Sequence, residues 1–92
     1  MRKTVSRIRK VCECTGLAKS TVHEHVAIGL LTPPIKISTN WAAWPDDEID
    51  MIVNARIAGW DNDQIRHLVK RLVAERKRLA PEVAAEEQRA AP

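Results

Sequence analysis

A glycine-centred turn between two short helical segments is the feature that most constrains this chain. Residues 8–14 place apolar and small side chains on one helical face, and Gly16 then ends the segment, because glycine adopts a positive φ without steric cost. A second helix is predicted over residues 18–28, with Val22 and Val26 on its apolar face. Two short helices joined in this way form either an ordinary helical hairpin or a helix-turn-helix.

A short hairpin is predicted after the second helix. Thr32-Pro33-Pro34 cannot be helical, because proline lacks an N–H and pushes the residue before it into an extended conformation. Residues 35–37 then alternate between apolar and polar side chains, residues 38–40 favour a turn, and residues 41–43 form the returning strand. A hairpin that follows a helix-turn-helix is a candidate wing.

A third helix is predicted to begin at Pro45, since proline suits the first helical turn. Acids occupy positions 46, 47, 48 and 50, where the helix dipole favours negative charge. Gly59 ends this helix. Its predicted apolar stripe is Ile49, Ile52, Val53 and Ile57.

A fourth helix is predicted over residues 62–79, after Asp61-x-x-Gln64, a variant of the capping box. Arg76 interrupts the last turn of its stripe, so burial there is expected to be incomplete in a lone domain. The helix therefore has two open interpretations, completion of the core or a contact with another protomer. Its predicted apolar stripe is Ile65, Leu68, Val69, Leu72, Val73 and Leu79.

Length and charge indicate one small domain with an uneven surface. Residues 1–7 are expected to be a basic flexible arm, residues 8–60 the main domain, residues 61–80 an amphipathic C-terminal helix and residues 81–92 a disordered tail. Residues 1–44 carry seven Lys/Arg against two acids. The predicted helix-turn-helix therefore lies in the most basic part of the chain, as a phosphate-facing surface requires.

Several other classes of protein are not expected. The sequence contains no apolar run long enough for a membrane span, and we expect a cytoplasmic protein whose two cysteines stay reduced. Cys12-x-Cys14 and His23-x-His25 are poor metal sites, because helical residues two apart point about 200° away from each other. No nucleophile–base pair or phosphate loop is present. We therefore expect no enzyme, no cofactor, no metal and no small-molecule substrate.

These motifs together resemble the AlpA-type prophage regulators and the excisionases of phages and integrative elements, relatives of the MerR-like winged-helix fold. The resemblance covers about residues 6–60, and the long last helix resembles that of recombination directionality factors from rhizobial integrative elements. It implies a mainly α fold with a small β-hairpin, a winged helix-turn-helix followed by a long C-terminal helix. The matching segments are Arg9-Lys10-Val11, Thr15-Gly16-Leu17, Lys19-Ser20-Thr21-Val22, Gly29, Pro34-Ile35-Lys36-Ile37 and Trp44-Pro45-x-x-Glu48-Ile49-Asp50.

The resemblance implies that the second helix enters the major groove of DNA and that the hairpin contacts the adjacent backbone or minor groove. The chain departs from the family pattern at Ala18, where the family has an N-capping serine, and at His23 and Glu24, where it favours an aromatic and a basic residue. The target DNA is therefore expected to differ from a typical family site. The expected contacts are Lys19, Ser20, Thr21, His23 and Glu24 in the second helix, Lys36, Ser38, Thr39 and Asn40 in the wing, and Arg2, Lys3, Arg7, Arg9 and Lys10 at the DNA backbone.

The implied function is that of an excisionase that binds and bends attachment-site DNA together with an integrase. The alternative is a transcriptional regulator of prophage or integrative-element genes that contacts RNA polymerase. A lone domain of this size reads one short half-site, so self-association on DNA is also expected. A metal or redox sensor that uses Cys12, Cys14, His23 and His25 is a further alternative.

Overall fold

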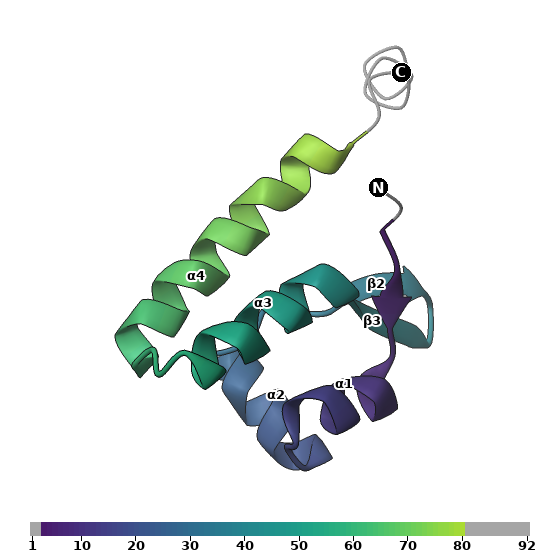
Figure 1. Cartoon of the computed structure of the whole chain (residues 1–92). Helices are drawn as coiled ribbons and strands as arrows, with labels where there is room; N and C mark the ends of the chain where they lie inside the picture. Colours follow the sequence, from purple (N-terminus) through teal and green to yellow (C-terminus); the bar gives the residue numbers. More distant parts are fainter. Residues whose placement is uncertain (1–2, 81–92) are drawn as a thin grey trace.

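The computed structural model describes residues 3–80, which form a mainly helical fold with a small three-stranded antiparallel sheet (Figure 1). Arg2 and the predicted tail at residues 81–92 lie outside the described residues. The elements in chain order are β1 (Val5–Ser6), α1 (Ile8–Thr15), α2 (Lys19–Ala27), β2 (Ile35–Ser38), β3 (Trp41–Pro45), α3 (Asp46–Ile57), α4 (Asn62–Glu75) and the 3₁₀ helix η1 (Arg76–Leu79).

The turn between α1 and α2 is confirmed at the predicted glycine. Gly16 has a φ of 72°, and its N–H donates to the carbonyl of Cys12 over 2.9 Å. The Thr15 hydroxyl donates to the carbonyl of Val11 and accepts a hydrogen bond from the N–H of Leu17. These bonds satisfy backbone groups that the end of α1 would otherwise leave open, and they fix the direction in which α2 starts.

The predicted hairpin is confirmed, but the flexible arm is not. In the sheet β3 lies between β2 and β1, and Val5 and Ser6 pair with Pro45 and Trp44. The prediction that residues 1–7 are a flexible arm is therefore wrong for its described part. The physical reason is non-local, because the free edge of β3 offers backbone partners to a two-residue strand. Pro45 is also the last residue of β3 rather than the first turn of α3.

Trp44 links the sheet to the core of the molecule. Its side chain is 1% exposed, and its indole N–H donates to the carbonyl of Thr32 over 2.7 Å. This bond joins β3 to the segment before β2 and satisfies the polar atom of a buried aromatic side chain. The core around it draws on α1, α2, α3 and α4, and its other buried members are Val11, Val22, Leu30, Leu31, Ile49, Ile52, Ala55, Ile65, Leu68, Val69 and Leu72.

Helix α4 packs along α3, which separates it from α1 and from most of α2 (Figure 1). The predicted capping box is confirmed, since the Asp61 carboxylate accepts from the N–H of Gln64 and the Gln64 side chain accepts from the N–H of Asp61. The predicted helix over 62–79 is α4 followed by η1. The prediction that Ile57 and Leu79 belong to the buried apolar stripes is wrong. Ile57 is 79% exposed at the end of α3, and Leu79 is 54% exposed in η1.

Burial is incomplete in the last turn, as predicted, since η1 contains no buried residue, but Arg76 itself forms a specific ion pair. Its guanidinium donates to both carboxylate oxygens of Glu48, over 2.8 and 2.7 Å, and to the carbonyl of Pro33 over 2.7 Å. Glu48 is only 5% exposed. Glu48, one of the acids that the helix dipole favours at the start of α3, is therefore one half of a buried ion pair. This pair ties the end of α4 to α3 and to the loop before β2.

Asp46 connects β1 to the start of α3 and gives a prediction about pH. The Ser6 hydroxyl, and after it the Thr4 hydroxyl, donates to the Asp46 carboxylate and lowers its pKa below the ordinary value of 3.8. A carboxylate whose pKa is lowered in the folded state stabilises the fold above its unfolded pKa, and this contribution disappears as pH falls through the folded pKa. We therefore expect Asp46→Asn to lower the free energy of unfolding by about 1 kcal/mol near neutral pH and by less below pH 4.

Urea denaturation at a series of pH values measures this difference. Asp50→Asn is the matched control, because Asp50 is an exposed acid on the same helix. A stability difference between the protein and Asp46→Asn that stays constant down to pH 2 would contradict the assigned role of Asp46.

Candidate nucleic-acid interface

Helix α2 presents a polar edge to solvent and an apolar edge to the core. Of the five predicted contact residues, Lys19, Ser20, His23 and Glu24 are exposed and Thr21 is half-buried. Val22 lies between them with its side chain fully buried. The helix is therefore held firmly from behind while its outer edge offers donors and acceptors suited to base edges. Ala18 precedes the helix in an extended conformation, and its methyl group provides no N-capping acceptor.

The hairpin places its predicted contact residues on an exposed ribbon. Lys36, Ser38, Thr39 and Asn40 are all exposed, on β2 and on the turn that follows it. Lys36 pairs with Ala42, and a register irregularity lies between Lys36 and Ser38. The alternation of side chains along the strand therefore changes at the tip.

Two large side chains of the hairpin, Ile37 and Trp41, are about half exposed. Neither residue is among the wing contacts that the sequence predicts. The sequence signal that could have identified them is the alternation of side chains along each strand, in which Ile37 and Trp41 occupy odd-numbered positions.

Arg7 meets the hairpin through a contact that the sequence does not indicate. Its guanidinium carbon lies 4.4 Å from the centre of the Trp41 ring, which is the geometry of a cation–π interaction. The pairing of β1 with β3 brings Arg7, at the start of α1, beside this ring. The predicted backbone contact at Arg7 therefore belongs to the hairpin surface.

Two other predicted backbone contacts face acidic groups. Lys3 forms an ion pair with Asp47. Lys10 borders a depression together with Asp46 and Asp50. The acids at the start of α3 therefore offset these two positive charges. The remaining predicted cation of α1, Arg9, is exposed.

The cysteine and histidine pairs occupy different environments. Cys12 is half-buried against the core and Cys14 is exposed. His23 is exposed on α2, whereas His25 is half-buried. Within residues 3–80, no group of three or more His, Cys, Asp and Glu side chains is placed to hold a metal ion. Nor does this part of the chain contain a helix that is long and apolar enough to cross a membrane.

A second basic surface lies on the exposed side of α4 and η1. It contains His67, Lys70, Arg71, Lys77 and Arg78, which the sequence places opposite the apolar stripe. The pair of Arg78 with Glu75 has an N–O distance of 3.8 Å between largely exposed side chains, so it contributes little to stability.

Comparison with known proteins adds no family to this description. No protein-family model matches the chain, and no curated protein matches it either.

Proposed function

We propose that this protein binds double-stranded DNA as a winged helix-turn-helix, with α2 in the major groove and the β2–β3 hairpin as the wing. The observation that carries the proposal is the exposed polar edge of α2 on a helix whose opposite edge is locked by fully buried Val22. A groove-reading helix needs both properties, because its contacts must be available and its orientation fixed. The preceding α1–α2 turn and the following hairpin occur in the chain order of a winged helix-turn-helix.

The charges support a division of roles between the two elements. Ser20, His23 and Glu24 can exchange hydrogen bonds with base edges, and Glu24 can accept from the amino group of cytosine. Lys36 and Arg7 carry positive charge beside the hairpin, where phosphate contacts give affinity without sequence preference. The ring of Trp41 holds the Arg7 guanidinium in place and so reduces the entropy that a phosphate contact costs.

On the resemblance of residues 6–60, we further propose that the protein acts in a mobile element as an excisionase. Several copies on adjacent sites would bend attachment-site DNA and help an integrase to assemble there. Bending a site of 20–30 base pairs costs about 1–6 kcal/mol, which several bound copies together can offset. The alternative proposal is a transcriptional regulator, since occlusion or recruitment of RNA polymerase uses the same DNA-binding surface.

The division of roles predicts different effects for two variants. We expect Lys36→Ala to weaken binding to all DNA sequences about equally and to reduce the magnitude of the salt slope by about 1. We expect His23→Ala to change the order of preference among sequences, because it removes a group that faces the bases. Selection of bound sequences from random duplex DNA, followed by titration of the selected and scrambled duplexes, measures both effects.

Lys70→Ala is the matched control, since Lys70 is an exposed lysine on α4. An equal loss of affinity in Lys70→Ala and Lys36→Ala would show that binding follows net charge and would contradict a role of the hairpin. An unchanged sequence preference in His23→Ala would contradict base contacts from this part of α2.

A further inference from the structure

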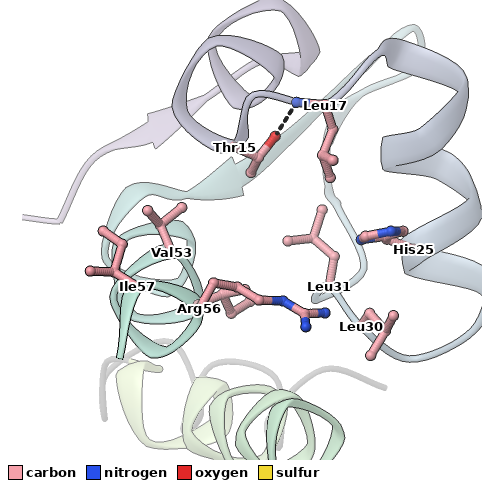
Figure 2. A pocket seen from close by; sticks show the side chains of 9 residues that line it. Thr15, Leu17, His25, Leu30, Leu31, Val53, Arg56 and Ile57 are labelled. Carbon is pink, nitrogen blue, oxygen red and sulfur yellow. Dashed lines mark hydrogen bonds between the residues drawn. The ribbon is translucent and has the colours of Figure 1, made fainter. Parts of the chain in front are cut away.

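A groove of about 300 Å³ lies behind α2, between the α1–α2 turn, the end of α2 and the C-terminal half of α3 (Figure 2). Its walls are mostly aliphatic, and α3 supplies one side while the loop after α2 supplies the other. The aliphatic lining residues are Leu17, Leu30, Leu31, Ile52, Val53 and Ile57.

Two nitrogen-bearing side chains face each other across this groove. Figure 2 shows the Arg56 guanidinium extended from α3 toward Leu31, with the His25 ring on the opposite wall. One Arg56 nitrogen donates to the side-chain oxygen of Asn62 over 2.9 Å, which holds the side chain in this position. A guanidinium has five N–H donors, so this bond leaves donors for a ligand. Within the described part of the chain, no acidic side chain lines the groove.

The aliphatic walls and the Arg56 guanidinium together indicate which kind of ligand the groove can bind. Aliphatic walls favour a hydrocarbon body. A guanidinium at the edge of such walls favours a carboxylate, which it can bind with two parallel hydrogen bonds. The geometry points to a binding site for a small amphipathic carboxylic acid, with its hydrocarbon chain between α3 and the loop after α2 and its carboxylate on Arg56 and His25.

The size of the groove favours a small molecule over a second protein. Its volume lies at the lower end of the range of about 300–1,000 Å³ that is typical of small-molecule sites. Nine residues line it, whereas stable protein interfaces use about 20–30 residues on each side. The site is independent of the proposed DNA surface, because His25 and His23 are two residues apart on α2 and point about 200° away from each other.

Binding of octanoate to the full chain, in the absence of DNA, tests this inference. We expect saturable chemical-shift changes at the methyl groups of Leu30, Leu31 and Val53 in methyl NMR spectra. The matched neutral probe is octanol, which has the same chain without the carboxylate and should bind at least about tenfold more weakly.

Two variants locate the carboxylate. Arg56→Met keeps an unbranched, mostly aliphatic side chain and removes the charge and the N–H donors, so the dissociation constant of octanoate should rise about tenfold or more. Lys70→Met removes a positive charge from α4 and should leave octanoate binding unchanged. Amide spectra of both variants establish that they fold.

Four results would overturn the inference. The first three are the absence of shifts at the groove methyl groups, equal binding of octanol and octanoate, and equal losses in Arg56→Met and Lys70→Met. Groove shifts that depend on protein concentration without any ligand would also overturn it, since they would show that a second copy of the chain fills the groove.

Discussion

Replacing Glu48 by leucine is expected to lower the free energy of unfolding by about 3 kcal/mol or more. The substitution leaves the Arg76 guanidinium, whose side chain is only 21% exposed, without its carboxylate partner. An uncompensated charge in this position loses both its ion pair and its access to water. The bond from Arg76 to the carbonyl of Pro33 remains but does not neutralise the charge. Urea denaturation followed by circular dichroism measures the change.

The double variant Glu48→Leu with Arg76→Met separates the ion pair from the packing around it. Because both charges are removed, we expect it to recover most of the stability that the single variant loses. Glu75→Gln breaks the exposed pair with Arg78 and should cost at most about 0.5 kcal/mol. A Glu48→Leu variant no less stable than Glu75→Gln would contradict the buried ion pair as the connection between α3 and the end of α4.

Replacing Trp44 by alanine is expected to lower the free energy of unfolding by about 3–5 kcal/mol. The side chain is 1% exposed, so the substitution leaves a cavity where β3 meets the helices. It also removes the donor of the 2.7 Å hydrogen bond to the Thr32 carbonyl. In a small domain, a loss of this size is a large part of the total stability and can unfold the protein.

Trp41→Ala is the matched control within the same strand. Trp41 is 51% exposed and contacts the Arg7 guanidinium, so its loss should cost about 1 kcal/mol or less. The proposed function predicts that Trp41→Ala weakens DNA binding, because Arg7 is no longer held beside the hairpin. Equal stability losses in the two variants would contradict the burial of Trp44 and the exposure of Trp41.

Local signals in the sequence predict most of the helices and the hairpin. Gly16 marks the turn because glycine alone adopts its positive φ without strain, and the Asp61–Gln64 capping box is a pattern of four consecutive residues. Each of these signals depends only on neighbours in the chain. The positions of Lys19, Ser20, His23 and Glu24 on the exposed edge of α2 follow in the same way from the helical period.

The features that sequence reasoning missed depend on contacts between distant segments. Nothing within Val5-Ser6 indicates a strand, because its pairing depends on the free edge of β3. An exposed acid would suit the start of a helix equally well, so the sequence does not indicate that Glu48 is buried. Only the packing of α4 on α3 brings Glu48 to Arg76. Ile57 fits the apolar stripe by its spacing but is exposed at the end of α3, where it lines the open groove behind α2.

The salt dependence of DNA binding tests the central claim most directly. The measurement is a titration of fluorescent duplex DNA, selected from random sequence, at several salt concentrations. If α2, the hairpin and Arg7 together contact six phosphates, the logarithm of the association constant should fall with the logarithm of salt concentration at a slope of about −5. A slope near zero, or an absence of binding to duplex DNA at low salt, would contradict the assignment of this surface to DNA.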